Sequence, residues 1–201
     1  MIKKYSDFMD EISPNDLYDR LIKYGLFSEK LPPIFDCSDF LAYCKKTERP
    51  VFPNQWYSYI TFNSMRNINV PRPIGIPTPM AHERLCACLR DNWGKLQEHF
   101  KLTTKEQSHI VSRIHIRKMR STEMLFKMNY TDWRIDGTPE PEISLGKKYL
   151  VKADISKCFP SIYSHAIPWA LVGKSEAKAN VKNKNIWYYQ TNFTLSTTES
   201  H

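Results

Sequence analysis

The run "VPRPIGIPTPMAHERLCACLRDNW", residues 70–93, changes its pattern part-way along and so indicates the fold class. Its first half is rich in prolines, which hold the backbone extended and remove donors that a central strand would need. Its second half predicts a long helix, with Thr78 as the N-cap and Pro79 at the first helical position. The apolar residues that share one face of this helix are Leu85, Leu89, Trp93, Leu96 and Phe100. The first half therefore reads as a rigid extended segment that leads into the helix; the alternative is a proline-rich ligand for another protein.

Two shorter helices and a strand are predicted before this run. The segment "SPNDLYDRLIKYG" begins with Ser13 as an N-cap followed by Pro14, and it ends at Gly25. Its apolar residues recur at helical spacing: Leu17, Leu21 and Tyr24. The segment "DFLAYCKK", residues 39–46, reads as a second helix. The segment "ERPVFPNQWYSYITF", residues 48–62, mixes prolines with β-formers and predicts an edge strand.

The charge of the chain indicates an anionic partner. The 201 residues are enough to bury a core, and the formal net charge is +8. Residues 95–130 hold eight Lys or Arg against three Asp or Glu, which gives a local charge of +5. Because Lys and Arg release counterions when they meet phosphates, this excess predicts attraction to polyanions. A solvated basic surface without such a partner is the alternative.

The cysteines and the N-terminus indicate a cytoplasmic protein. The five cysteines are an odd number without a disulfide framework, and the first residues are too charged for a secretory signal. Cys86 and Cys88 form a C-x-C pair with no second pair, so we expect small core residues rather than a zinc site. No apolar run approaches the length of a membrane span. A reducing cytoplasm and no membrane partner are therefore expected.

A basic ribbon is predicted at "SRIHIRK", residues 112–118, which alternates in the manner of a strand. Ile114 and Ile116 share one face, and the other face carries Arg113, His115 and Arg117. Such a face can grip a triphosphate or a nucleic-acid backbone. An exposed edge strand that charge protects from aggregation is the alternative.

The stretch "KKYLVKADISKCFPSIYSHAIPWAL", residues 147–171, carries one carboxylate at a revealing place. The segment "YLVKADI" has the character of a short strand, so Asp154 lies at its C-terminal end. In α/β sheets ligands bind at that end, and a carboxylate there can hold Mg²⁺ together with substrate phosphates. An aspartate that caps a turn or forms a salt bridge is the alternative.

The longer run "YLVKADISKCFPSIYSHAIPWALVGK", residues 149–174, resembles the bacterial abortive-infection, or defence-associated, class of reverse transcriptases. The run at residues 72–93 is similar to the family's entry into the fingers, where an "IP-x-P" element opens a helix. The resemblance extends over about residues 72–184. It implies an α+β fold of reverse-transcriptase-like fingers followed by the beginning of a palm, which is incomplete. The corresponding regions are an N-terminal helical and extended region at 1–70, fingers at 71–146 and the start of the palm at 147–201.

The resemblance also implies a function and its partners. It implies RNA-directed or untemplated DNA synthesis, and a role in aborting phage infection. The expected partners are an RNA or DNA template and primer, deoxynucleoside triphosphates and a second copy of the chain, since oligomers are known in the class.

Specific residues take roles by the same resemblance. Asp154 would ligate two catalytic Mg²⁺ ions, and the backbone carbonyl of Ile155 could add a ligand. Phe159 would lie beneath the incoming sugar and exclude a 2′-hydroxyl. The cationic residues expected to position the triphosphate are Arg113, Arg117, Lys118 and Arg120. In the tail of the motif, Ser164 is expected to cap a helix, and His165 and Trp169 are read as packing residues.

The family's "Y-x-D-D" hairpin is missing, because the sequence contains no adjacent Asp-Asp pair. One carboxylate cannot hold two divalent ions in the geometry of phosphoryl transfer, so the chain alone is expected to be inactive. We therefore expect an N-terminal portion that stops before that hairpin. Two other hypotheses remain: a non-catalytic basic module that binds nucleic acid, and a remnant that folds poorly.

Overall fold

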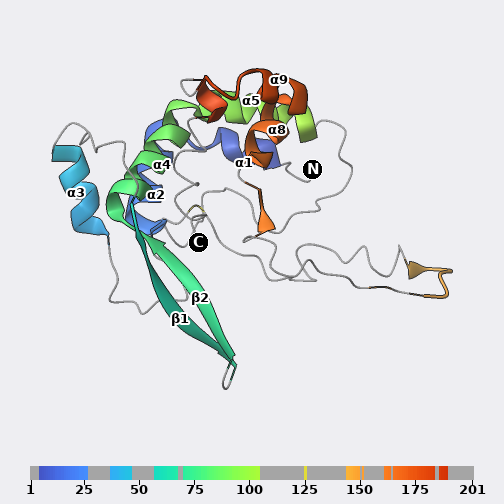
Figure 1. Cartoon of the computed structure of the whole chain (residues 1–201), viewed down its shortest axis with the longest axis horizontal. Coiled ribbons are helices and arrows are strands. Elements are labelled where there is room, and N and C mark those ends of the chain that lie inside the picture. Colours follow the sequence, from blue (N-terminus) through green and yellow to red (C-terminus); the bar gives the residue numbers. More distant parts are fainter. Residues whose placement is uncertain are drawn as a thin grey trace.

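The computed structural model describes residues 5–26, 37–46, 57–67, 70–104, 125, 144–149, 151, 161–163, 165–183 and 186–189. These residues form helices and one two-stranded antiparallel sheet, so the prediction of a mixed α+β chain is confirmed (Figure 1). The helices are α1 (Tyr5–Asp10), α2 (Pro14–Tyr24), α3 (Ser38–Lys46), α4 (Pro79–Asp91), α5 (Trp93–Thr104), α8 (Ala166–Val172) and α9 (Lys174–Ala179). The strands are β1 (Tyr59–Asn67) and β2 (Val70–Pro77). No described helix is both long and apolar enough to cross a membrane.

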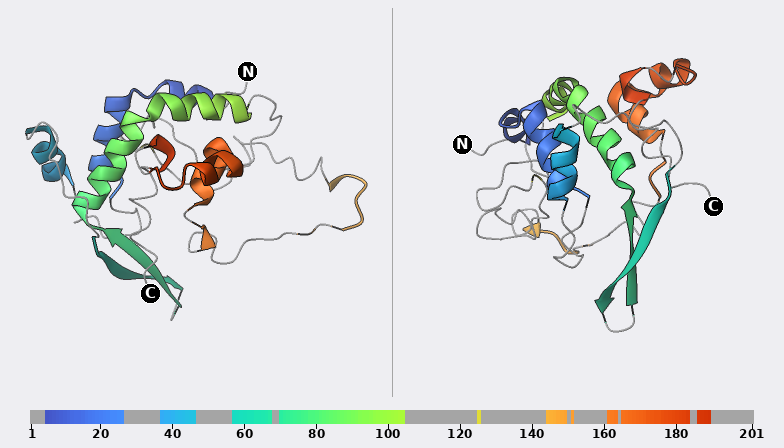
Figure 2. Two further views of the ribbon diagram at one scale, coloured as in Figure 1. Left: turned by 45° about the horizontal axis from the view of Figure 1, so that its top comes forward. Right: turned by 90° about the vertical axis from the view of Figure 1, so that its left-hand side faces the viewer.

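Two pairs of packed helices form the main body. Helix α2 packs on α4, and α1 packs on α5 (Figure 2). The pairs run antiparallel, because residues late in α2 and α1 meet residues in the first halves of α4 and α5. Thus the His82 imidazole reaches the Leu21 carbonyl, and the Gln97 amide reaches the Met9 carbonyl.

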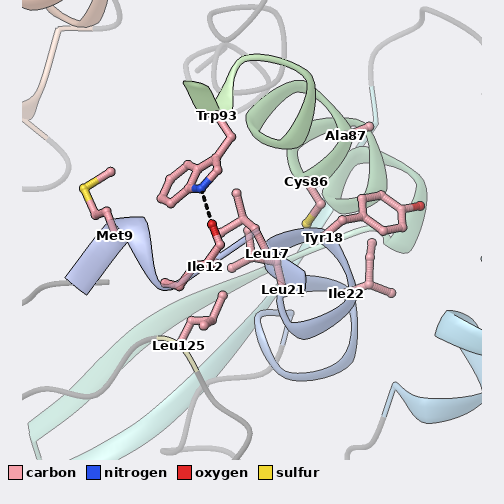
Figure 3. Packing of buried hydrophobic residues seen from close by; sticks show 10 residues of the cluster. All are labelled: Met9, Ile12, Leu17, Tyr18, Leu21, Ile22, Cys86, Ala87, Trp93 and Leu125. Atoms are coloured by element: carbon pink, nitrogen blue, oxygen red, sulfur yellow. Dashed lines mark hydrogen bonds between the residues drawn. The ribbon is translucent and has the colours of Figure 1, made fainter. Parts of the chain in front are cut away.

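The chain bends between α1 and α2 and again between α4 and α5. Both bends lie at the buried Trp93. Trp93 is 1% exposed, and its indole N–H donates to the carbonyl of Ile12, in the break between α1 and α2, at 2.8 Å (Figure 3). The bond satisfies a carbonyl that lies outside both helices, and the indole ring fills the space beside it. The buried apolar cluster around it comprises Met9, Ile12, Leu17, Tyr18, Leu21, Ile22, Cys86, Ala87, Trp93 and Leu125.

Helix α2 forms as its sequence predicts. The Ser13 hydroxyl accepts a hydrogen bond from the Asp16 backbone N–H at 3.2 Å, and Pro14 opens the helix. Gly25 ends it, and its N–H donates to the Leu21 carbonyl at 2.7 Å. A Cβ atom at this glycine would lie 3.3 Å from the His82 ring, so the small residue lets α4 approach closely. Helix α3 is confirmed as well.

The prediction of one long helix after Pro79 is wrong in its length. The helix breaks at Asn92, whose backbone has φ −110° and ψ 10° and whose side-chain amide donates to the Cys88 carbonyl at 2.9 Å. Beyond the break Trp93 is buried and Leu96 packs against the core, whereas Phe100 at the far end of the predicted face is exposed. Thr78 occupies the N-cap position, but its hydroxyl makes no capping hydrogen bond.

The β1–β2 ribbon projects from the helices and joins α4 at its base (Figure 1). The proline-rich run is thus an edge strand that leads into a helix, and the predicted strand before it begins at Tyr59. Pro71, Pro73 and Pro77 are even numbers of residues apart, so their nitrogens lie on one edge of β2. Because these nitrogens carry no hydrogen, this edge resists pairing with a further strand.

Candidate functional site

The residues predicted to hold metal and nucleotide lie outside the described residues. They are Asp154, Ile155, Phe159, Arg113, Arg117, Lys118 and Arg120, and Ser164 and the ribbon at 112–118 lie outside as well. The predicted roles of these residues therefore stay predictions, as does the division of the chain at positions 70 and 146. The structure does describe the residues that flank the motif and a set of buried polar residues between the helices.

The segment before Asp154 is not a strand at the two described positions. Tyr149 and Val151 lie in irregular backbone and are 80% and 85% exposed. A short apolar strand is stable when it pairs with a neighbour and buries one face. In the described part of the chain only β1 and β2 pair in this way, so the strand expectation is not met at these two residues.

The tail of the motif contains a helix from Ala166 to Val172, as the sequence predicts. Helix α8 contains Pro168 and Trp169, and Pro168 is fully buried in the first turn, where a missing N–H does no harm. The N-cap position falls on His165, whose side chain makes no capping hydrogen bond. Gly173 ends α8 with φ +84° and ψ 155°, a conformation that strongly favours glycine, and α9 begins at the next residue.

An aromatic cluster lies at the start of α8. The Tyr163 ring centroid is 5.0 Å from that of His165 and 5.6 Å from that of Trp169. The ammonium nitrogen of Lys174 lies 5.0 Å from the centre of the Trp169 ring, within the range of a cation–π contact. His165 and Trp169 thus make the packing contacts expected of them. Tyr163 stays 53% exposed.

Helix α9 connects this cluster to α5. The Tyr189 hydroxyl donates to the carbonyl of Ala177, and both residues are buried. Two residues earlier, the Trp187 ring lies under Lys95 of α5, with 5.2 Å between the ammonium nitrogen and the ring centre. The Asn180 amide donates to the carboxylate of Glu176 at 2.8 Å and helps to end α9. Helix α8 thus packs against α9, and residues 186–189 contact both α9 and Lys95 of α5.

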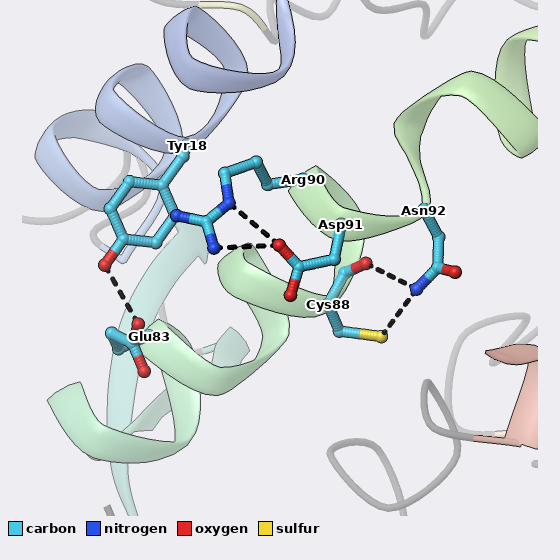
Figure 4. Close-up of polar contacts among 6 residues, drawn as sticks. All are labelled: Tyr18, Glu83, Cys88, Arg90, Asp91 and Asn92. Carbon is cyan, nitrogen blue, oxygen red and sulfur yellow. Dashed lines mark hydrogen bonds and ion pairs between the residues drawn. The ribbon is translucent and has the colours of Figure 1, made fainter. Parts of the chain in front are cut away.

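A second set of polar residues is buried between α2 and α4. The Tyr18 hydroxyl donates to the Glu83 carboxylate at 2.9 Å, and Glu83 is only 2% exposed (Figure 4). The Arg90 guanidinium covers the Tyr18 ring at 5.0 Å and also forms an ion pair with Asp91 at 2.8 Å. Burial, and then the neighbouring Glu83 carboxylate, raise the pKa of Tyr18 well above its ordinary value.

The same interface buries a histidine and two thiols. The Nε2 atom of His82 lies 2.9 Å from the Leu21 carbonyl and 3.5 Å from the Cys86 sulfur. Burial lowers the pKa of His82, although the hydrogen bond to Leu21 opposes this shift. Burial raises the pKa of Cys86, and that of Cys44 on α3 is raised for the same reason. These groups are held in their neutral forms.

The buried set is suited to a structural role. Its thiols are protonated rather than nucleophilic, and its residues sit within the helix interface. Within the described ranges no three His, Cys, Asp or Glu side chains gather in a way that could hold a metal ion. Cys86 is fully buried, which confirms the expectation of a small core residue, and Cys88 is half-buried.

The spacing of the large apolar residues in α4 does not reveal this buried set. Leu85 and Leu89 are only half-buried, whereas the buried positions of α4 are Ala81, His82, Glu83, Cys86 and Ala87. The available signal was the row of small residues, which allows α2 and α4 to approach closely. A tyrosine on α2 then meets a carboxylate on α4.

Comparison with known proteins adds no relative. No model of a known protein family matches the sequence. A search of characterised proteins likewise finds no match.

Proposed function

We propose that this chain is a reverse-transcriptase-like protein of the bacterial antiphage type, in which Asp154 supplies one carboxylate of a two-magnesium site. The observation that carries the proposal is the continuous run at residues 149–174, which resembles the family's first catalytic motif and its continuation. Two described features are compatible with it. The "IP-x-P" element ends β2 and opens α4, and α8 follows the motif.

The oxygen atoms at the motif suit magnesium. A carboxylate from Asp154 and a backbone carbonyl from Ile155 are the hard ligands that Mg²⁺ prefers, and substrate phosphates complete such a site. Magnesium there would assist attack of a primer hydroxyl on the α-phosphate and neutralise the leaving pyrophosphate. Phe159 would restrict the site to deoxynucleotides by occupying the space of a 2′-hydroxyl. Arg113, with the other cationic finger residues, would bind the triphosphate.

The 201-residue chain by itself is expected to bind nucleic acid but not to extend it. A two-metal site needs further carboxylates, and these residues contain no adjacent Asp-Asp pair. Nucleic-acid binding follows from the net charge of +8, and steep weakening with salt is its signature.

The test is primer extension with Mg²⁺ and labelled deoxynucleotides. The natural gene product that contains these residues should incorporate nucleotide, and Asp154→Asn should lower the rate by at least about 100-fold. Asp19→Asn is the matched control, since Asp19 pairs with Lys45 on the surface at 2.6 Å. Incorporation that survives Asp154→Asn would refute the proposal. Robust incorporation by the 201-residue chain would refute only its predicted inactivity. Salt-sensitive binding without any incorporation by the natural gene product would favour the non-catalytic module.

A further inference from the structure

We infer that Tyr163, Trp169 and the lysines of α9 form a surface that binds single-stranded nucleic acid, with Tyr163 as a stacking platform for a base. This surface is called the α8–α9 surface below. The inference stands on ring geometry, exposure and charge, and it does not need the metal site.

The Tyr163 ring is held in place by its neighbours and is open to solvent. Tyr18, Tyr188 and Tyr189 are buried, whereas Tyr163 leaves 53% of its surface open to solvent. Two neighbouring rings hold it, with centroid distances of 5.0 Å to His165 and 5.6 Å to Trp169. A ring that is already ordered loses little conformational freedom when a ligand binds. Every nucleobase has a π-face, so such a ring accepts bases of any sequence.

The second argument is the charge beside the ring. Lys174 and Lys178 lie one helical turn apart on α9, and Lys182 follows in the next turn of chain; all three are exposed. Between His165 and Asn183 the sequence contains these three lysines and a single acid, so the segment carries a formal net charge of +2. That acid, Glu176, accepts the hydrogen bond from Asn180. The lysines therefore offer positive charge to a phosphate backbone.

Together these features select the partner. Lys174 lies 5.0 Å from the Trp169 ring centre and thereby places an ammonium group at the edge of the aromatic cluster. Aromatic rings next to cationic groups are the combination by which proteins bind single strands without sequence preference. In a duplex the bases are stacked on one another and cannot reach Tyr163. A single strand, of DNA or of RNA, is therefore the partner that this surface fits.

The test measures the affinity of the 201-residue chain for a fluorescent oligothymidylate. Fluorescence anisotropy reports the binding, at low salt and without nucleotide or metal. Tyr163→Leu should weaken binding by about 5-fold or more, because one stacked base contributes about 1–3 kcal/mol, or about 5- to 150-fold. Tyr163→Phe keeps the ring and should bind within about twofold of the parent chain. The matched control is Tyr43→Leu, since Tyr43 is 50% exposed and stacks on Phe40 in a helix with two lysines in its last turn.

Three further arms separate stacking from charge and identify the strand. An abasic strand of the same length should bind as weakly to the parent chain as oligothymidylate binds to Tyr163→Leu. Replacing Lys174, Lys178 and Lys182 by Gln should lower the slope of log affinity against log salt by about 2, since each phosphate contact on a single strand contributes about 0.7. Oligouridylate in place of oligothymidylate shows whether the surface prefers RNA.

Two results would overturn the inference. One is equal affinity of the parent chain and Tyr163→Leu for oligothymidylate. The other is a dimer that depends on Tyr163, seen by sedimentation, without any oligonucleotide binding; this would make the surface a contact between two copies. Because the assay contains neither magnesium nor nucleotide, its failure leaves the role proposed for Asp154 open, and failure of primer extension leaves this surface intact.

Discussion

The helix pairs α1/α5 and α2/α4 and the α8–α9 surface use the same kinds of residues in opposite ways. Between α2 and α4 the Tyr18 hydroxyl is buried against Glu83. On the α8–α9 surface, Tyr163 is half-exposed and Lys174 lies over Trp169. A buried polar group that satisfies another buried group contributes to a unique fold, whereas an exposed ring beside a cation is available to a ligand.

The two regions are expected to govern different properties of the chain, namely its stability and its binding of a ligand. The motif that carries the proposed function adjoins the exposed rings, whereas the buried Tyr18, Glu83 and Trp93 lie far from it in sequence. Changes in the helix pairs should therefore alter the free energy of unfolding, and changes on the α8–α9 surface should alter binding.

The largest expected effect is that of Trp93→Ala. Loss of a fully buried indole and of its hydrogen bond to Ile12 should lower the free energy of unfolding by about 3–5 kcal/mol. The control is Trp187→Ala, since Trp187 is only half-buried beneath Lys95 and should cost about 1–2 kcal/mol. Urea unfolding measures both. Equal losses would break the contrast between the two regions.

The next effect is that of Tyr18→Phe. The substitution keeps the ring against Arg90 but removes the donor to a carboxylate that is almost wholly buried. We expect a loss of about 1–3 kcal/mol, the usual cost of removing a buried hydrogen bond to a carboxylate. Tyr43→Phe on α3, where the side chain is half-exposed, should change stability by less than about 0.5 kcal/mol. A similar small effect at Tyr18 would show that the bond to Glu83 is not structural.

Two glycines give effects of opposite sign. Gly173→Ala should cost about 1–3 kcal/mol, because φ +84° and ψ 155° strain any residue with a Cβ atom, even though no more distant part of the described chain would lie within 4 Å of that atom. Gly94→Ala should stabilise the chain by about 0.5–1 kcal/mol, because Gly94 lies in α5 and a Cβ atom there would meet none of the described residues outside its own helix. Thermal melts of the two variants are the measurement. Shifts in the same direction would contradict this account of the two backbones.

The smallest effect is a dependence of stability on pH. The pKa of His82 is lowered from 6.5, so the unfolded chain takes up the proton first and stability falls as the pH drops below about 6.5. The pKa of Cys86 is raised from 9.0, so the unfolded chain loses the proton first and stability falls above about pH 9. His82→Gln should flatten only the acid side, and Cys86→Ala only the alkaline side. Urea midpoints measured across this pH range test both variants. If the dependence of stability on pH is the same in a variant as in the parent chain, other groups cause it.

The sequence predicts local structure well where one residue decides it. Ser13, Pro14 and Gly25 set the limits of α2, and the prolines of the ribbon force an edge strand. These predictions succeed because backbone dihedrals and missing donors act within a few residues. A helix is likewise predicted in the tail of the motif, and α8 forms there.

The sequence predicts poorly what depends on distant residues. The break at Asn92 is matched to the break at Ile12, and only the packed pair of helices shows why Trp93 lies between them. The partnership of Tyr18 and Glu83 spans 65 positions and leaves no periodic signal. Tyr149 illustrates the converse, since its strand-like surroundings find no partner strand in the described part of the chain.

Affinity and stability measured on one preparation of Tyr163→Leu separate a binding role of this ring from a structural one. We expect the affinity for single-stranded oligothymidylate to fall by about 5-fold or more while the free energy of unfolding stays within about 0.5 kcal/mol of that of the parent chain. An unchanged affinity, or a loss of binding that merely follows a loss of stability, would contradict this expectation.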